Sequence, residues 1–269
     1  MKAVSKTAYY CGGVRMQDAE SDHPVIGDNY AKRLLGDEGL KYWQEFKEFK
    51  AANAGNVARH YIIDRTLKQL LNDHPDSTII LIGVGLDSRA YRFKSGDWIE
   101  IDETSVIEYK NNVLPLGECK NKLKRIPIDF EKDKLSDKLS PYTNRSHIII
   151  VIEGVFLYLN HAQKEELVNS LTSLFPRHTL LCDLMKKDFF EKYGGDLHKK
   201  LVAQGTAFTD IEQEPNKLFI NKGYKQISVT STIRMAKNLG LVRIPGFLLL
   251  FFKKLVRGYA VYNFTLIKA

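Results

Sequence analysis

The segment between residues 78 and 102 constrains the fold of this chain more than any other part. A continuously apolar run (TIILI, 78–82) leads into a turn that contains Gly83 and Gly85, and a second strand-like run, WIEID (98–102), ends at Asp102. Short, continuously apolar, β-branched runs predict strands that are covered on both faces. Glycine tolerates dihedrals that other residues avoid and lets a ligand lie against the backbone. Because ligands bind at the carboxyl ends of parallel strands, the segment predicts a nucleoside-binding edge.

Strand and helix patterns alternate along the rest of the chain and indicate the fold. Three more runs have the length and β-branching of buried strands: 123–128, 147–152 and 179–184. Apolar residues at helical spacing precede or separate the strands, at 55–71, 103–114 and 161–175. Strands that alternate with helices predict an α/β fold with a parallel, Rossmann-like sheet wound on both sides.

The pattern changes after Met185. Residues 186–220 are polar and helix-prone, and two alternating runs, 224–230 and 259–267, are typical of half-exposed or edge strands. Between these runs the apolar stretch 244–256 predicts a helix with cations at its end: Lys253, Lys254 and Arg257. Its role stays open between a packed helix, a lid over an apolar acceptor and a contact with a membrane surface.

Composition and the N-terminal sequence exclude several classes of protein. The net charge is +8 over 269 residues, and cations alternate with acids as in KYWQEFKEFK (41–50), so no nucleic-acid partner is expected. The three cysteines are far apart and no histidine pair has helical metal spacing, so neither a metal site nor a disulfide is expected. No signal peptide and no transmembrane segment is evident, which predicts a soluble cytoplasmic protein.

Asp102 indicates which ligand the glycine turn binds. It lies 19 positions after Gly83, where a carboxylate can accept hydrogen bonds from both ribose hydroxyls. The alternative is that Asp102 caps the next helix. A dinucleotide also needs a helix N-terminus for its pyrophosphate, but the segment after Ser88 is cut short at Gly96. With no hydride-transfer residues evident, the segment favours S-adenosylmethionine over a nicotinamide cofactor.

Six segments together resemble the leucine carboxyl methyltransferase family, in the family's order. They are GDNYA (27–31) with LL (34–35), AR (58–59) with DRT (64–66), GVGLDSRAYR (83–92), EID (100–102), IPIDF (126–130) and EGVFLYL (153–159). The match covers about residues 5–185 and is specific through the pairing of the glycine turn with EGVxxYL. The resemblance implies a class I methyltransferase fold with antiparallel last strands and an N-terminal helical cap.

The resemblance also implies a cofactor site made of Arg15, Arg59, Gly83, Gly85, Asp102, Asp129, Phe130 and Glu153. Arg59 would hold the carboxylate of S-adenosylmethionine, a task suited to a guanidinium fork, with Arg15 as a second N-terminal contact. The two glycines would line the methionine moiety and Asp102 would take the ribose.

The resemblance assigns three further residues to adenine and to the cationic groups of the cofactor. Asp129 and the backbone of Phe130 would bind adenine, and Glu153 would face the ammonium and sulfonium charges. Ordinary alternatives remain: Arg59 could pair with Asp64 or Asp28, and Asp129 could cap a turn.

The expected function is O-methyl transfer from S-adenosylmethionine to a carboxyl or hydroxyl of a small-molecule acceptor. A hydroxyl would need a general base, and His60, His161 and His198 are candidates, but no catalytic residue is assigned. The alternatives are a non-catalytic sensor or interaction protein that binds S-adenosylmethionine, and an NAD-dependent oxidoreductase. The expected division is a cap (1–54) and a core (55–269), with insertions at 186–220 and 240–257 that shape an acceptor pocket.

Overall fold

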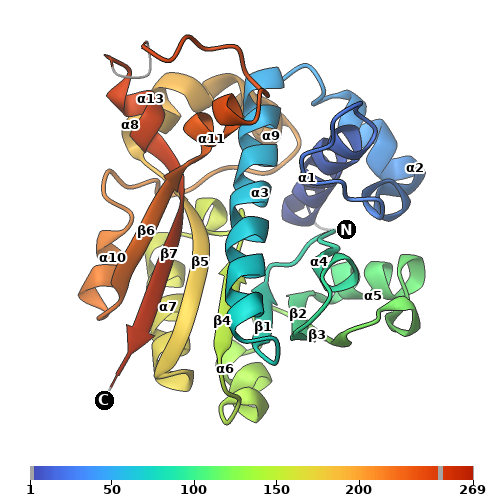
Figure 1. Cartoon of the computed structure of the whole chain (residues 1–269), viewed down its shortest axis with the longest axis vertical. Coiled ribbons are helices and arrows are strands. Elements are labelled where there is room, and N and C mark those ends of the chain that lie inside the picture. Colours follow the sequence, from blue (N-terminus) through green and yellow to red (C-terminus); the bar gives the residue numbers. More distant parts are fainter. Residues whose placement is uncertain (1–2, 248–250, 269) are drawn as a thin grey trace.

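The computed structural model, which describes residues 3–247 and 251–268, is an α/β fold built on one seven-stranded sheet (Figure 1). The strand order across the sheet is β3-β2-β1-β4-β5-β7-β6. The strands are β1 (Thr78–Ile82), β2 (Asp97–Glu103), β3 (Lys122–Ile128), β4 (Ile148–Ile152), β5 (Arg177–Met185), β6 (Lys225–Ser231) and β7 (Tyr259–Ile267). All seven predicted strands are confirmed, with ends that shift by at most two residues.

Strand direction places the candidate site at one edge of the sheet. β1 to β5 are parallel, whereas β7 inserts antiparallel between β5 and β6. The antiparallel last strands are therefore confirmed. Because parallel strands share their carboxyl ends, Gly83, Asp102 and Glu153 all lie at the same edge.

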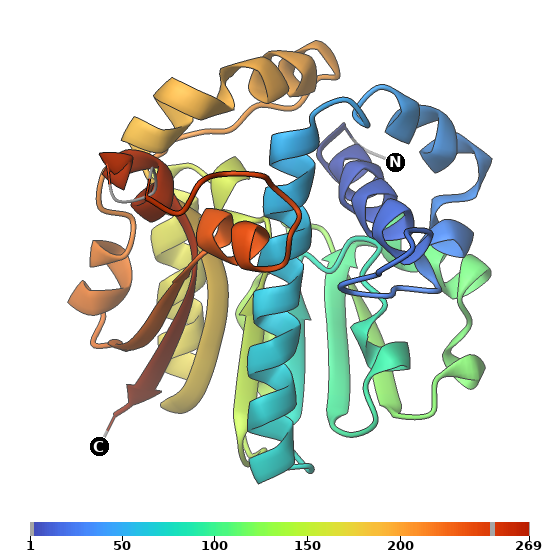
Figure 2. The ribbon, with the colours of Figure 1, turned by 45° about the horizontal axis from the view of Figure 1, so that its top comes forward.

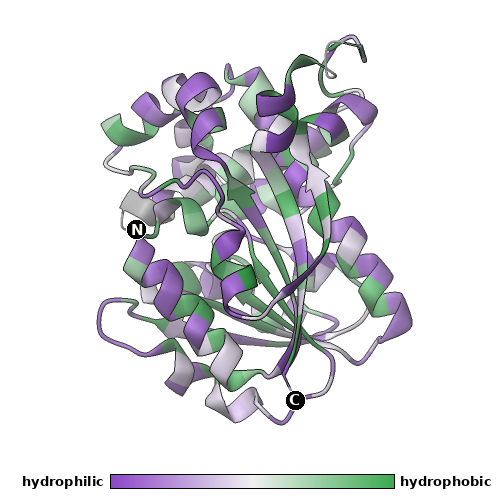
Figure 3. Cartoon of the chain, turned by 90° about the vertical axis from the view of Figure 1, so that its left-hand side faces the viewer, coloured by the Kyte–Doolittle hydropathy of each residue, from purple (hydrophilic) through white to green (hydrophobic). Residues whose placement is uncertain are grey.

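Both faces of the sheet are buried, which explains the continuously apolar strands. Successive side chains on a strand point to opposite faces. In β1, Ile79 and Leu81 belong to one apolar cluster and Ile80 and Ile82 to a second cluster on the other side. The central strands are accordingly hydrophobic along their length (Figure 3).

Helices cover both faces and the carboxyl edge (Figures 1 and 2). The first cluster includes residues of α1 (Ala3–Ala19), α2 (Ala31–Gln44), α3 (Lys50–Asp73), α4 (Arg89–Arg92), α5 (Thr104–Val113), α9 (Gly195–Ala203) and α11 (Thr232–Asn238). The second includes residues of α6 (Leu135–Leu139), α7 (His161–Leu174) and α10 (Lys217–Asn221). Shorter elements are η1 (Leu116–Glu118), η2 (Ser140–Tyr142), η3 (Phe156–Tyr158), α8 (Lys187–Phe189), η4 (Phe190–Gly194) and α13 (Lys253–Gly258).

Helix α3 links the N-terminal helices to the sheet. It runs from Lys50 to Asp73, around the helix expected at 55–71, and ends before Pro75 because the residue that precedes a proline disfavours helical dihedrals. The expected boundary between cap and core, after residue 54, falls inside this continuous helix. The division into cap and core stays a prediction.

The predicted helix at 244–256 is wrong in its first part. Residues 244–247 are irregular or turn backbone, and residues 248–250 lie outside the described part of the chain. Phe251 is helical, and α13 begins at Lys253 after a break at Phe252. Pro245 has no N–H to donate and Gly246 disfavours helix, which explains why residues 244–247 are not helical. Within the described ranges no helix has the length and apolar character needed to cross a bilayer.

Candidate functional site

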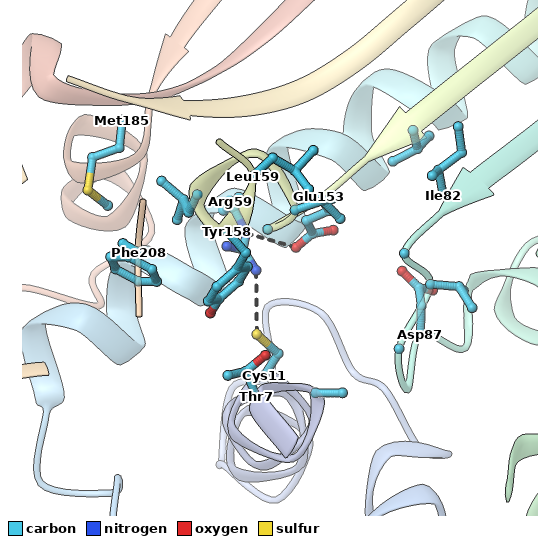
Figure 4. A pocket seen from close by; sticks show the side chains of 18 of the residues that line it. Thr7, Cys11, Arg59, Ile82, Asp87, Glu153, Tyr158, Leu159, Met185 and Phe208 are labelled. Atoms are coloured by element: carbon cyan, nitrogen blue, oxygen red, sulfur yellow. Dashed lines mark hydrogen bonds and ion pairs between the residues drawn. The ribbon is translucent and has the colours of Figure 1, made fainter. Parts of the chain in front are cut away.

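A cavity of about 910 Å³ lies at the carboxyl edge of the sheet, against α1, α3 and the segment from α8 to α9. Ile82 and Asp87 line one side, Met185 and Phe208 line the opposite side, and Arg59 lies between them (Figure 4). The first side, which we call the polar end, comprises Gly83, Gly85, Asp87, Asp102, Glu103 and Glu153. The second, the apolar end, comprises Met185, Phe189, Tyr193, Leu197, Leu201, Phe208, Ile233 and Leu255.

The glycine turn after β1 forms the floor of the polar end. Gly83 and Gly85 have φ angles of +68° and +50°, which side-chain-bearing residues rarely adopt. An added Cβ at Gly83 would lie 2.5 Å from Cγ2 of Val155, so the turn also packs closely on the segment after β4. The Gly83 N–H donates to the Ile101 carbonyl at 2.9 Å, which ties the turn to the end of β2.

Asp102 braces this turn from the adjacent strand. Its carboxylate accepts from the Gly85 N–H at 2.6 Å and from the Glu103 N–H at 2.7 Å. Burial raises the pKa of Asp102 to about 6, in spite of these two hydrogen bonds. A carboxylate has about four acceptor positions, so Asp102 keeps capacity for ribose hydroxyls. Glu103, which the sequence did not single out, also ends β2 and lines the cavity.

Glu153 and Arg59 meet at the centre of the cavity. Arg59 Nε donates to Glu153 Oε1 at 2.9 Å, and both side chains are nearly buried. Burial raises the pKa of Glu153, but Arg89, His60 and Arg59 outweigh this effect and hold it well below its ordinary value. Arg59 therefore pairs with Glu153, and neither Asp28 nor Asp64 is its partner.

Asp183 and Tyr259 complete the surroundings of Arg59, and the sequence did not identify either as a site residue. Arg59 donates to the Tyr259 hydroxyl at 2.8 Å, and this hydroxyl donates to Asp183 Oδ2 at 2.6 Å. The other Asp183 oxygen accepts from the Gly154 N–H at 2.6 Å. A lone carboxylate within the apolar run TLLCDL was the available signal for Asp183, whereas Tyr259 comes from a distant strand.

Arg89 is the centre of a buried ion-pair network under the polar end. It is fully buried and pairs with Asp64, Asp87 and Glu153, the last at 2.7 Å. His60, Asp87 and Glu153 place ligand atoms within 4.8 Å of one another, as a metal site would. The Arg89 guanidinium contacts all three, with His60 Nδ1 at 2.9 Å, so it supplies the positive charge at this point.

Arg15 also lines the cavity, from the end of α1. Its Nε donates to Asp28 at 2.9 Å and a terminal nitrogen donates to the Leu86 carbonyl at 2.7 Å. Arg15 thus connects the glycine turn with the loop that precedes α2. Its role as a cofactor contact stays a prediction.

The two residues expected at adenine lie differently. Phe130 lines the cavity and is 46% exposed. Asp129 is not one of the lining residues: its carboxylate accepts from the Glu131 N–H at 3.0 Å and pairs with Lys132, the turn-capping arrangement. Adenine binding by Asp129 stays a prediction.

The three candidate histidines lie away from the cavity wall. His60 is buried within the Arg89 network, His161 is exposed near Glu212, and His198 accepts from the Phe208 N–H at 3.0 Å. None of the three lines the cavity. The geometry therefore gives no support to a histidine base.

The model of the leucine carboxyl methyltransferase family matches residues 11–172, which is more than half of the chain. The chain belongs to the leucine carboxyl methyltransferase family. S-adenosylmethionine is the methyl donor of its relatives, so the family membership confirms the cofactor that the glycine turn suggested.

Two relatives illustrate the family. The tetracenomycin polyketide synthesis O-methyltransferase TcmP of Streptomyces glaucescens is 26% identical, over 63% of this chain and 61% of its own length. The S-adenosyl-L-methionine-dependent methyltransferase dpfgK of Gibberella zeae is 25% identical, over 76% of this chain and 74% of its own. The match thus spans less than two thirds of TcmP.

Solved structures bear out the class I methyltransferase fold. A DUF574 family protein from Streptomyces avermitilis has a TM-score of 0.57 at 9% identity, with 95% of this chain and 96% of the other covered. Magnesium protoporphyrin IX methyltransferase from Synechocystis, solved with SAH, has a TM-score of 0.50 at 12% identity, with 86% and 96% covered.

The polar end suits a cofactor that carries positive charge. Around Glu153 the buried network has more carboxylates than guanidinium groups: Asp28, Asp64, Asp87, Glu153 and Asp183 against Arg15, Arg59, Arg89 and Arg92. S-adenosylmethionine has an ammonium and a sulfonium group against a single carboxylate, so this excess of acids complements its net positive charge. The glycine turn leaves the backbone open to close approach, and Asp102 lies beside it. The role of Asp102 as a ribose acceptor stays a prediction.

Proposed function

We propose that this protein transfers the methyl group of S-adenosylmethionine to an oxygen of a small, largely apolar acceptor, with a carboxylate favoured over a hydroxyl. The contrast between the two ends of one cavity carries this proposal. The polar end offers charged and backbone groups for the cofactor, and the apolar end offers aromatic and aliphatic side chains that an apolar acceptor would contact. Arg59 and Glu153 lie where the two ends meet (Figure 4).

The lack of a histidine base among the described lining residues favours the carboxylate. Burial raises the pKa of Tyr10 and Tyr158, so both hydroxyls remain protonated and can donate hydrogen bonds but cannot remove a proton. A carboxylate is already ionised at neutral pH and needs no general base, whereas a hydroxyl does.

The protein's contribution to such a transfer is to position the groups and exclude water. S-adenosylmethionine, when bound, supplies the methyl group on a sulfonium, which is electrophilic without further activation. Glu153 and Asp102 would orient the cofactor from the ends of β4 and β2. The apolar end would exclude water and hold the acceptor in line, an effect that can account for much of a rate enhancement.

The name of one relative supports a small-molecule acceptor. TcmP is named for the synthesis of a polyketide and as an O-methyltransferase. The apolar end is suited to a molecule with similar apolar character, because apolar side chains dominate its lining.

Calorimetry and a labelled-methyl assay test the proposal. S-adenosylmethionine and S-adenosylhomocysteine should bind and NAD should not. Aromatic and aliphatic carboxylic acids should then accept labelled methyl as esters, which release methanol in base, whereas the matching alcohols and phenols should not. Stable methyl ethers would shift the proposal to a hydroxyl acceptor. Binding without turnover on both panels would support the non-catalytic sensor.

Glu153→Gln tests whether Glu153 contributes to cofactor binding. Losing the charge should weaken S-adenosylmethionine binding at least about tenfold, because a buried charge-assisted contact is worth roughly 1.5–3 kcal/mol. Glu212→Gln, which changes a partly exposed carboxylate outside the cavity, is the matched control. Equal affinities for both variants would remove Glu153 from the cofactor site.

A further inference from the structure

The charge of the chain is divided very unevenly along its length. No aspartate or glutamate occurs after Glu214, yet this C-terminal part has ten basic residues: Lys217, Lys222, Lys225, Arg234, Lys237, Arg243, Lys253, Lys254, Arg257 and Lys268. The whole chain has a net charge of only +8. The part up to Glu214 is therefore slightly acidic, and the entire excess of positive charge lies in the C-terminal part. Such asymmetry is typical of contact with an anionic partner.

Several of these cations lie around a group of exposed aromatic side chains. Phe247, Phe251 and Phe252 are 62%, 77% and 42% exposed. Lys253, Lys254 and Arg257 follow directly on α13 and are exposed. Gly246 directly precedes Phe247, and an added Cβ at Gly246 would lie 3.6 Å from Lys237 Nζ. This part of the chain therefore lies beside α11. We call this surface the basic phenylalanine face: Lys237, Arg243, Phe247, Phe251, Phe252, Lys253, Lys254 and Arg257.

Most of this positive charge is not neutralised within the protein. Lys254 pairs with Asp188 at 2.8 Å. Arg243, Lys253 and Arg257 have no ion pair with any acid in the described ranges. Exposed phenylalanine with unpaired lysine and arginine is the composition of segments that insert aromatic rings among acyl chains while their cations meet anionic headgroups.

The basic phenylalanine face adjoins the apolar end of the cavity. Leu255 of α13 and Ile233 of α11 line that end, although both helices also belong to the face. In Figure 1, α8, α11 and α13 gather at the end of the molecule opposite the C-terminus. The basic phenylalanine face is thus continuous with the wall of the apolar end.

From these observations we propose that the basic phenylalanine face docks on the surface of an anionic lipid bilayer. Docking would bring the apolar end of the cavity next to the lipid, where apolar acceptors concentrate. A nucleic-acid duplex fits less well, because its bases are stacked inside the helix and exposed phenylalanine rings add nothing to contact with its phosphates. Single-stranded RNA, whose bases could stack on these rings, is tested directly below. The inference does not depend on methyl transfer, since it concerns only where the protein binds.

Vesicle co-sedimentation of the full chain tests the proposal. Vesicles of phosphatidylcholine with about 30% phosphatidylglycerol should bind the protein at least tenfold more strongly than phosphatidylcholine alone. About 0.5 M salt should abolish most of this difference, because it screens the cations. Equal binding to neutral and anionic vesicles, or no binding to either, would overturn the proposal.

Two sets of variants locate the contact. Phe247→Ser, Phe251→Ser and Phe252→Ser together should weaken anionic-vesicle binding about tenfold, and so should Lys253→Glu with Arg257→Glu. The matched controls change exposed side chains elsewhere: Leu116→Ser, Ile227→Ser and Ile267→Ser for the first set, and Lys94→Glu with Lys120→Glu for the second.

The same variants are also tested for folding and for binding to other anionic partners. Every variant should keep the thermal midpoint and S-adenosylmethionine affinity of the parent, because none of the changed residues lines the cavity. The lipid assignment would be refuted by two results together: the phenylalanine variant binds anionic vesicles as well as the parent does, and the parent binds single-stranded RNA or an acidic peptide equally strongly. The face would then bind through charge alone.

Discussion

The two ends of the cavity differ in how their side chains are held in place. At the polar end, Arg89, Asp64 and Glu153 are fixed by one another through ion pairs, in a region almost without solvent. At the apolar end, the ring of Phe208 is held by packing against the rings of Tyr158 and Phe190. Directional contacts specify one geometry and apolar packing tolerates exchange. We therefore expect the polar end to be rigid and the apolar end to tolerate substitution.

Arg89→Met should have the largest effect. Removing the guanidinium leaves Asp64, Asp87 and Glu153 buried without their shared partner, so the free energy of unfolding should fall by about 3–5 kcal/mol. Urea unfolding measures it. Arg33→Met, which removes the exposed pair with Glu118, should leave the unfolding midpoint almost unchanged. Similar midpoints for both variants would show that the network does not hold the polar end together.

Gly83→Ala should come next, with a loss of about 1–3 kcal/mol. The φ of +68° is unfavourable for alanine, and the new Cβ would meet Val155 at 2.5 Å. Adding Val155→Ala should restore part of the lost stability, because it removes the close contact and leaves only the dihedral strain. Gly117→Ala is the control, since nothing lies within 4 Å of its added Cβ. A double variant no more stable than Gly83→Ala alone would contradict the packing argument.

The raised pKa of Asp102 predicts a smaller effect, a dependence of the free energy of unfolding on pH. Its pKa is raised from 3.8 to about 6 by burial, so the folded protein binds a proton more readily than the unfolded chain. This group therefore lowers stability as pH rises from about 4 to about 6, by at most about 1.4 kcal/mol per pH unit. Asp64, whose pKa is lowered, acts with the opposite sign and below pH 4.

Urea unfolding at several pH values measures the contribution of Asp102. The slope between pH 4 and 6 should be less negative, or more positive, in Asp102→Asn than in the parent. Asp196→Asn, at a 92% exposed side chain, should keep the parent slope. Identical slopes in all three proteins would mean that the Asp102 carboxylate is not desolvated.

Phe208→Ala should have the smallest effect on the cofactor. Its ring packs at the apolar end against Tyr158, so S-adenosylmethionine affinity should change less than about threefold, while the range of accepted acids should widen. Calorimetry and the labelled-methyl assay measure the two quantities. A tenfold loss of cofactor affinity would contradict the separation of the two ends.

Local patterns in the sequence were sufficient for much of the fold. The run TIILI with Gly83 and Gly85 specifies a strand and a turn because covered strands must be apolar and positive φ angles favour glycine. The seven strands and the carboxyl edge follow from such local rules. The helix expected at 244–256 failed at Pro245, where a local breaker outweighed apolar periodicity.

Pairing across the chain was decided only by the tertiary structure. The partners of Arg59 are Glu153, Asp183 and Tyr259, between 94 and 200 residues away, and sequence spacing offers no measure of such contacts. The same holds for the cavity's apolar end, whose wall combines α9, α11 and α13. The sequence alone thus determined strands, turn and cofactor, since these depend on neighbouring residues. The ion pairs and the apolar end of the cavity depend on how distant segments pack, and only the folded chain shows them.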